Sequence, residues 1–258
     1  MAKEVSMIVS WNGRLVDGES VELPVDDPLF LRGEGVFETL RFEQGRVCLW
    51  DRHLGRLQTS VRLLGWTLPD PEVLLARVVG VVEANGLSLA RVRITVGREI
   101  MISAQAFSDE DPGIAVHTCS FPINERSPLV MVKGTSYAEN TWILNQSGVA
   151  EVIRPNTRGE LCEGCISNLF FVKEGRVMTP SLETGCLPGV MRAEIMDRIE
   201  VEEGCWPMEI LLEAEEIWLS NALRRLRYVK VINDRKLLEP SERYWSLQAT
   251  LKVFGTKA

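Results

Sequence analysis

Short apolar runs separated by turn dipeptides constrain the fold of this chain more than any other feature of its sequence. Asn12-Gly13, Gln44-Gly45 and Glu174-Gly175 each lie between two β-prone runs, a pattern typical of antiparallel strands joined by tight hairpins. Helical spacing of apolar residues appears elsewhere, but strand and helix do not alternate regularly, and no Gly-x-Gly-x-x-Gly motif occurs. The sequence therefore predicts an α+β fold with mixed sheets and flanking helices.

Two helices and a domain division are predicted from apolar spacing and from loop signals. Apolar residues recur at helical spacing from Asp51 to Leu64, where Gly65 ends the pattern, and again over Pro71 to Ala84. The segment 121–128 contains two prolines and several polar residues, as connections between domains do. We therefore expect an N-terminal α+β domain over 1–120, a connection over 121–128 and a C-terminal domain over 129–258.

The run Ala90 to Val96 predicts a strand with two different faces. Its alternation places Arg91, Arg93 and Thr95 on one face and apolar residues on the other. Two arginines on one strand face suit the binding of a carboxylate group. The alternative is a solvated sheet face, which is the more frequent outcome of such a pattern.

Lys133 follows an apolar run, 129–132, which predicts a buried strand, and it precedes Gly134 to Tyr137. Burial disfavours the charged form of an amine, so a lysine at a buried strand end is a candidate nucleophile. The alternative is a lysine whose stem lies along apolar surface while its ammonium group reaches water.

Five motifs in a fixed order resemble the class IV (fold-type IV) family of pyridoxal-phosphate (PLP) enzymes. That family includes branched-chain and D-amino-acid aminotransferases and 4-amino-4-deoxychorismate lyase. The motifs lie at Arg32 to Thr39, His53 to Leu57, Lys133 to Tyr137, Gly159 to Phe170 and Leu187 to Arg192. The resemblance implies a two-domain fold like that of D-amino-acid aminotransferase, PLP as cofactor, and small amino and keto acids as substrates.

The resemblance also implies roles for single residues. Lys133 matches the lysine that forms the Schiff base, Glu163 the carboxylate that faces the ring nitrogen, and Tyr137 the partner of the ring phenolate. The residues that match the phosphate-binding positions are Arg56, Val190, Met191, Asn221 and Ala222. Met191 and Ala222 depart from the family's pattern, because many aminotransferases carry a hydroxyl donor there.

Phe37, Thr39, Arg91 and Arg93 are the candidates for substrate binding, and the residue that matches Arg93 lies at the mouth of the active site in the family. An aminotransferase would move an amino group between an amino acid and a 2-oxo acid through Lys133. The alternative is 4-amino-4-deoxychorismate lyase, which releases pyruvate and 4-aminobenzoate. Thr39 favours the lyase, because branched-chain aminotransferases usually have glycine there. A third reading, a scaffold without catalysis, conflicts with the presence of all the cofactor-binding residue types.

The composition of the chain limits the binding partners and the cellular location that we expect for the protein. The formal net charge of −7 argues against nucleic acid or an anionic membrane as the main partner, and no apolar run approaches the roughly 20 residues that span a bilayer. Six cysteines and two histidines offer one Cys-x-x-Cys pair, at Cys162 and Cys165, with nothing to complete a tetrahedral site, so we expect no metal. The cysteines are expected to be small buried hydrophobes in a cytoplasmic protein. The resemblance implies a homodimer.

Overall fold

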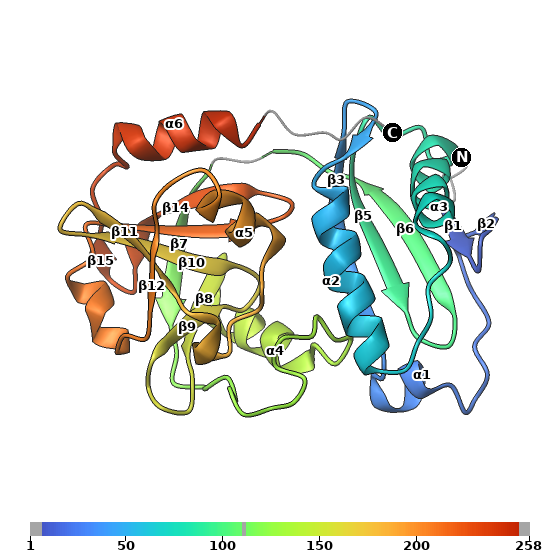
Figure 1. Ribbon diagram of the computed structural model, residues 1–258, viewed down its shortest axis with the longest axis horizontal. Coiled ribbons are helices and arrows are strands. Elements are labelled where there is room, and N and C mark those ends of the chain that lie inside the picture. Colours follow the sequence, from blue (N-terminus) through green and yellow to red (C-terminus); the bar gives the residue numbers. More distant parts are fainter. Residues whose placement is uncertain (1–6, 110–111, 253–258) are drawn as a thin grey trace. The chain divides into compact units, whose positions relative to one another are not determined.

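The computed structural model describes residues 7–109 and 112–252, and it divides the chain into two compact units (Figure 1). Within the described residues, unit 1 holds 7–109 and 133–136, and unit 2 holds 112–132 and 137–252. Residues 1–6, 110–111 and 253–258 of the two predicted domains lie outside the described residues. Among the described residues, the division falls between residue 109 and residue 112 rather than within 121–128. The reason is that strand β7 (Gly113–Thr118) is hydrogen-bonded into the sheet of unit 2.

Unit 1 is built on one antiparallel sheet of six strands in the order β2-β1-β6-β5-β3-β4. The strands are β1 (Ile8–Trp11), β2 (Arg14–Asp17), β3 (Val36–Glu43), β4 (Arg46–Val47), β5 (Leu89–Val96) and β6 (Ile100–Ala106). The helices are α1 (Pro28–Arg32), α2 (Trp50–Leu63) and α3 (Pro71–Ala84). The predicted helices over 51–64 and 71–84 are therefore confirmed.

The three turn dipeptides lie at hairpins, as predicted. Asn12-Gly13 joins β1 to β2, Gln44-Gly45 joins β3 to β4, and Glu174-Gly175 joins two strands of unit 2. Both residues of each pair have positive φ, from 50° to 86°. Two consecutive left-handed residues give the type I′ turn, whose twist matches that of the strands it joins.

The two faces of the unit 1 sheet differ in what covers them. Helices α2 and α3 pack against one face, as Figure 1 shows for α2 beside β3. On that face Val92, Ile94 and Val96 are at most 1% exposed, which confirms the predicted apolar side of this strand. The opposite face carries Arg91, Arg93 and Thr95. The polar side chains of β5 therefore lie on the sheet face opposite α2 and α3.

Unit 2 contains a nine-stranded sheet in the order β12-β11-β10-β13-β14-β7-β8-β9, with β15 paired to β14. The pairs β7 with β8, β7 with β14 and β11 with β12 are parallel, so the sheet is mixed, as predicted. Besides β7, its strands are β8 (Glu151–Pro155), β9 (Leu161–Gly164), β10 (Asn168–Lys173), β11 (Arg176–Pro180), β12 (Glu202–Gly204), β13 (Glu216–Asn221), β14 (Arg225–Ile232) and β15 (Arg235–Lys236). Its helices are α4 (Ala138–Ser147), α5 (Val190–Met196) and α6 (Glu242–Thr250).

The core of unit 2 is apolar on one side of the sheet and aromatic under α6. Ile153, Leu161, Leu169 and Phe171 are fully buried in one cluster. On α6, the centroid of the Tyr244 ring lies 5.8 Å from that of Trp218, in a tilted contact, and 5.4 Å from that of Tyr228, in an edge-to-face contact. The Tyr244 hydroxyl donates to the Leu226 carbonyl at 3.0 Å. The hydroxyl is thus satisfied inside an otherwise apolar contact.

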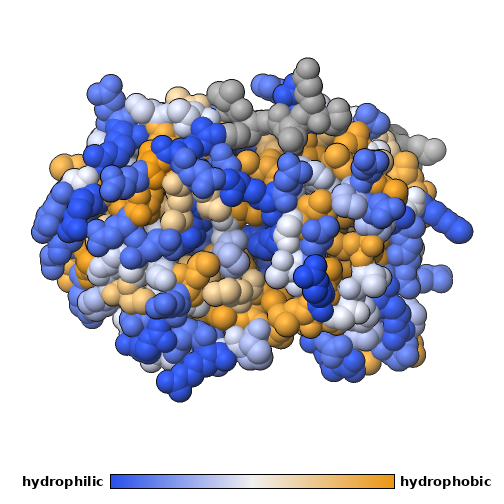
Figure 2. All heavy atoms as spheres, in the orientation of Figure 1, coloured by the Kyte–Doolittle hydropathy of each residue, from blue (hydrophilic) through white to orange (hydrophobic). Residues whose placement is uncertain are grey.

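Within the described part of the chain, no helix is long and apolar enough to cross a membrane. On the face of the molecule drawn in Figure 2, hydrophilic residues are interspersed with apolar ones. Cys48, Cys162, Cys165 and Cys186 are buried, as predicted for small hydrophobes, whereas Cys205 is exposed and Cys119 is half-buried. Burial raises the pKa values of Cys165 and Cys186 to about 12, so both thiols stay protonated.

Candidate active site

Lys133 does not follow a strand, which corrects our prediction for 129–132. These residues form turns, in which the Val130 amide donates to Ser127 and the Val132 amide to Leu129. Local hydrogen bonds of this kind replace the pairing that a strand needs. Leu129 and Met131 are 47% and 42% exposed, so the run is not buried.

Pairing with β3 instead holds Lys133 in place. Its carbonyl accepts from the Phe37 amide at 2.9 Å, and the Thr135 amide donates to Gly35 at 2.9 Å. Gly134 forms an antiparallel bridge with Val36. The Thr135 hydroxyl donates to the Gly33 carbonyl at 2.8 Å. These bonds fix a half-buried lysine at the start of β3, about 100 residues away in the chain.

The amine of Lys133 lies on the face of the unit 1 sheet that carries the arginines. Its Nζ lies 4.7 Å from the centroid of the Phe37 ring. The guanidinium carbon of Arg93 lies 3.7 Å from the same centroid, and Arg93 Nε donates to the Thr95 hydroxyl at 3.2 Å. Two cations therefore share one aromatic ring. Such a pair can attract a carboxylate and present an amine beside it.

Thr39 and Arg91 complete this face of the sheet. Thr39 is half-buried and lies opposite Arg93 in the register of β3 and β5, so both side chains emerge on the same face. Arg91 is exposed.

Arg41, which was not among the predicted site residues, lies opposite Arg91 on the same face. Arg41 is 2% exposed, and its two terminal nitrogens donate to Asp109 at 2.7 Å each. Its Nε donates to Glu43 at 2.9 Å. Two carboxylates thus balance its charge. The alternation Phe37-Glu38-Thr39-Leu40-Arg41 was the signal that could have placed it on this face.

A buried ion cluster on the helix side of the sheet holds Arg56. Glu38 is 1% exposed and accepts from Arg56 Nε and Nη2, both at 2.7 Å. Its Oε2 also lies 2.7 Å from His53 Nδ1. Burial raises the pKa of this carboxyl, but the Arg56 and His53 contacts together outweigh burial and lower it to about 2. Glu38 therefore stays ionised and orients the Arg56 guanidinium.

Replacing Glu38 by glutamine is expected to lower the free energy of unfolding by about 3 to 5 kcal/mol, because the change leaves a largely buried guanidinium without its counter-charge. In the parent protein the contribution of Glu38 is present above pH 4.5 and is lost as the pH falls towards 2, since its folded pKa lies below the ordinary value. Urea unfolding between pH 3 and 7 measures both effects. Glu34→Gln is the control, because Glu34 pairs with Arg32 on the surface.

In unit 2, Glu163 is held at the end of β9. Its Oε2 accepts from the Leu187 amide at 3.0 Å and from Asn168 Nδ2 at 3.1 Å. Asn168 Nδ2 also donates to the Leu187 carbonyl at 2.8 Å. Glu163 therefore has a defined orientation through neighbours that sequence reasoning had not assigned.

Tyr137 precedes α4, and its hydroxyl donates to the Cys165 carbonyl. The same carbonyl accepts from Asn140 Nδ2 at 2.8 Å. Burial raises the pKa of Tyr137 to about 12, and the nearby Glu163 and Glu151 carboxyls add to this shift. The phenol therefore remains protonated and acts as a donor near neutral pH. Asn140 also donates to the Cys165 carbonyl. The Tyr137 hydroxyl can therefore rotate and donate to another acceptor while that carbonyl keeps a hydrogen bond.

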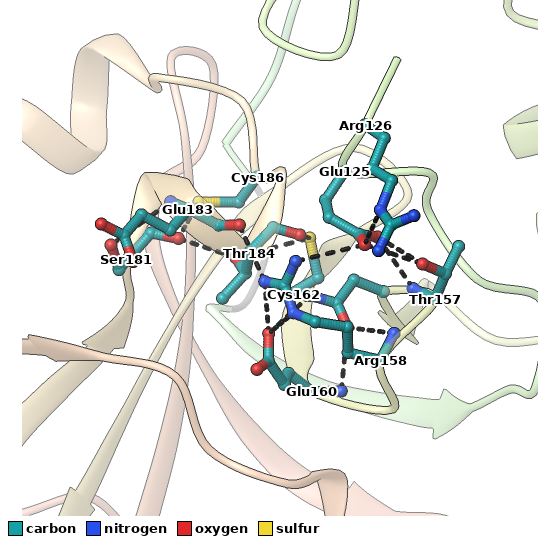
Figure 3. A network of polar contacts seen from close by, with 11 residues as sticks. Glu125, Arg126, Thr157, Arg158, Glu160, Cys162, Ser181, Glu183, Thr184 and Cys186 are labelled. Atoms are coloured by element: carbon teal, nitrogen blue, oxygen red, sulfur yellow. Dashed lines mark hydrogen bonds and ion pairs between the residues drawn. The ribbon is translucent and has the colours of Figure 1, made fainter.

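Figure 3 shows the polar network that fixes the β8–β9 hairpin and so the strand bearing Glu163. The Glu125 carboxylate accepts from the Thr157 hydroxyl at 2.8 Å. Arg158 donates to Glu160 at 2.6 Å and to the Glu183 carbonyl at 3.0 Å. On β9 itself, the Cys162 thiol lies 3.3 Å from the Thr184 carbonyl. These contacts join the hairpin to the segment that leads to Leu187.

The candidate phosphate-binding residues of unit 2 lie at one helix start and one strand end. Val190 and Met191 are buried in the first turn of α5, where backbone N–H groups have no acceptor within the helix. The Asn221 amide oxygen accepts from the Leu223 and Arg224 amides at 3.1 and 2.9 Å, and its NH₂ group donates to Ser167 at 3.1 Å. Ala222 is half-buried in the turn that follows β13.

The predicted site residues fall into two sets. Unit 1 brings Lys133, Phe37, Thr39 and Arg93 to one face of its sheet and holds Arg56 on the opposite, helix-covered side. Unit 2 holds the remaining cofactor residues, with Glu163 and Tyr137 joined through the Cys165–Asn168 segment. The roles expected for the members of both sets remain predictions.

Comparison with known proteins agrees with this architecture. The fold is similar to that of the branched-chain aminotransferase of the archaeon Thermoproteus uzoniensis, solved with norvaline, with a TM-score of 0.88 and 26% identity. That match covers 96% of this chain and 94% of the other. The fold is thus that of the fold-type IV transaminases.

The model of the amino-transferase class IV family matches residues 35–232, and the chain belongs to this family of PLP-dependent enzymes. The chain is 29% identical over 241 residues to an aminodeoxychorismate lyase of Bacillus subtilis (strain 168), and this alignment covers 82% of each protein. It is 27% identical over 286 residues to a putative branched-chain-amino-acid aminotransferase of Methanocaldococcus jannaschii, and this alignment covers 97% of each protein.

Proposed function

We propose that this protein is a PLP-dependent aminotransferase that moves an amino group between an amino acid and a 2-oxo acid, with Lys133 as its catalytic residue. The observation that carries the proposal is the placement of Lys133 in a chain of this family. Backbone pairing to β3 fixes this half-buried lysine beside Phe37 and Arg93. An amine and a guanidinium held near the same aromatic ring are suited to move the Cα proton of a substrate whose carboxylate the guanidinium binds.

The donor set of the chain fits PLP in its chemistry. The cofactor needs an amine, a carboxylate for its ring nitrogen, a donor for its phenolate and an anion site for its phosphate. Lys133, Glu163 and Tyr137 would meet the first three needs. Glu163 is already oriented by two N–H donors, and the raised pKa of Tyr137 keeps its hydroxyl a donor.

The phosphate would be held by the amide groups of Val190 and Met191, with Arg56 as counter-charge. Asn221 and Ala222 are secondary candidates, because the Asn221 side chain is engaged in its own turn and the alanine side chain has no donor.

Bound PLP supplies an aldehyde that condenses with amines and a ring that withdraws electrons from the substrate. The residues of this chain do the remaining work. Arg93 binds the substrate carboxylate, Phe37 and Thr39 line the face beside it, and Lys133 moves a proton from the substrate Cα. Glu163 keeps a proton on the ring nitrogen through its negative charge.

Purified protein treated with borohydride is expected to carry the cofactor covalently on one peptide, the one that contains Lys133. Reduction followed by proteolysis and mass spectrometry locates the label. Lys133→Arg should abolish labelling, whereas Lys230→Arg, on β14, should be labelled like the parent. Label on any lysine other than Lys133 would contradict the assignment.

The second candidate function is that of 4-amino-4-deoxychorismate lyase. Arg91 and Arg93 emerge on one sheet face, as a dicarboxylate substrate would require, and Thr39 lies opposite Arg93. The similarity to the lyase of Bacillus subtilis supports this candidate as well.

Two parallel assays distinguish the reactions. One follows the consumption of an amino acid with pyruvate or 2-oxoglutarate, and the other follows the release of pyruvate from aminodeoxychorismate. Amino transfer without pyruvate release supports the first candidate, and the reverse result supports the lyase. A homodimer in the cytoplasm is the expected setting for either, and sedimentation velocity tests the assembly.

A further inference from the structure

Glu151, the first residue of β8, is a buried carboxyl group to which neither candidate reaction assigns a role. It is 2% exposed. Its Oε1 accepts from the amides of Val152 at 3.1 Å and Ile166 at 3.2 Å, and Oε2 lies 3.3 Å from the Ile166 amide. The Ser167 side chain also hydrogen-bonds to this carboxyl. Glu151 thus binds the turn between β9 and β10 at two successive residues.

The close approach of Glu151 explains the glycine that follows Glu163. A Cβ atom on Gly164 would lie 2.8 Å from the Glu151 carboxyl carbon and 3.1 Å from Oε1. Gly164 does not have positive φ, so space rather than backbone conformation requires glycine here. The Gly164 amide donates to the Ser167 carbonyl at 2.8 Å and closes the turn. Glycine follows Glu163 because the carboxyl group of Glu151 packs against the backbone at this position.

This turn joins several residues that the proposed function uses. Glu163 precedes it, and Asn168, which holds Glu163, follows it. The Cys165 carbonyl within it accepts from Tyr137, and the Ser167 hydroxyl accepts from Asn221. Moving the turn would move both the carboxylate proposed for the ring nitrogen and the acceptor of the Tyr137 proton.

We propose that Glu151 is a positioning residue, whose carboxyl fixes the 164–167 turn and thereby the orientations of Glu163 and Tyr137 for catalysis. The inference rests on the proposed PLP-dependent function. Glu151 acts through the Ile166 amide and the Ser167 hydroxyl and does not itself touch the reacting atoms.

The protonation of Glu151 predicts a pH dependence of the free energy of unfolding. Burial raises its pKa to about 7; hydrogen bonds from Ser167, Val152 and Ile166 lower it, and the Glu163 charge raises it. Tyr137 and Cys165 are the other titratable groups coupled to it. The folded protein keeps a proton that the unfolded chain releases from about pH 4.5 upwards. The free energy of unfolding should therefore fall between pH 4.5 and 7 and level off above.

Three variants test the proposal in the full-length protein. Glu151→Ala should lower kcat about 10- to 100-fold, as loss of an orienting partner does, and should change KM for the amino donor less than about 3-fold. Glu151→Gln should restore most of the rate, because its amide oxygen can accept from Ile166 and its NH₂ group can donate to Ser167. Gly164→Ala should act like Glu151→Ala by displacing the carboxyl. Glu174→Ala, at an exposed hairpin turn, is the control.

Two readouts do not depend on turnover. Amide exchange at Ile166 should be at least about 10-fold faster in Glu151→Ala and near the parent rate in Glu151→Gln, since exchange reports local opening. The fall in stability between pH 4.5 and 7 should disappear in Glu151→Gln. If Glu151→Ala does not fold, the glutamine and Gly164→Ala variants decide the question.

Several outcomes would overturn the inference while leaving the proposed function intact. They are a normal kcat in Glu151→Ala or Gly164→Ala, no rescue by glutamine, and unchanged exchange at Ile166, each in a protein that borohydride still labels at Lys133. Absence of label in the parent protein would overturn the proposed function, and the exchange and pH measurements would still decide whether Glu151 holds the turn.

Discussion

Glu163→Gln is expected to slow removal of the substrate Cα proton by about 10²- to 10³-fold, as loss of one preorganised electrostatic contact does, while PLP still binds. The Leu187 amide and Asn168 Nδ2 both donate to Glu163, so glutamine would turn its oxygen towards them. Its NH₂ group would then face the ring nitrogen, which could no longer hold a proton. Exchange of the Cα proton into deuterated water, followed by NMR, measures the effect.

The control for this substitution is Glu202→Gln, which removes an exposed carboxylate of β12 that pairs with Arg176. It should leave the exchange rate unchanged. A rate near that of the parent in Glu163→Gln, with cofactor bound, would mean that a different group holds the ring nitrogen.

Arg93→Ala is expected to lower kcat/KM for carboxylate substrates by roughly 30- to 1,000-fold, which corresponds to about 2 to 4 kcal/mol for a charge-assisted, partly buried pair. The guanidinium lies over Phe37, on the sheet face that presents Lys133. Borohydride labelling at Lys133 should persist, because Arg93 is proposed to touch substrate and not cofactor. Steady-state kinetics with several amino acids provides the measurement.

Arg91→Ala is the matched comparison, since Arg91 lies two residues away on the same strand face but is exposed. With a monocarboxylic substrate the loss should be well below about 1 kcal/mol, as for a surface charge. A dicarboxylate such as aminodeoxychorismate should respond to both substitutions. Unchanged KM in both variants would leave the arginines as a solvated sheet face, and the segment 97–104 would be examined next for the carboxylate site.

Local sequence signals predicted the three hairpin turns, the two long helices of unit 1 and the two faces of β5. The turn dipeptides adopt positive φ, and the helices over 50–63 and 71–84 end beside glycines with positive φ. The alternation of β5 placed Arg91 and Arg93 on the face opposite the buried Val92 and Ile94. These signals depend on dihedral preference and periodicity, which act within a few residues.

The sequence alone therefore determined the α+β class, the hairpins, the faces of the strands and the resemblance to class IV enzymes. Only the tertiary structure decided how Lys133 is held. The apolar run before it was predicted to be a strand but forms turns, and backbone hydrogen bonds to β3 and to the residue before it fix the lysine instead. It also decided that Glu38 pairs with Arg56 and that Glu151 packs against Gly164. Contacts of this kind join residues far apart in the chain, and no local preference specifies which distant partner a buried charge will find.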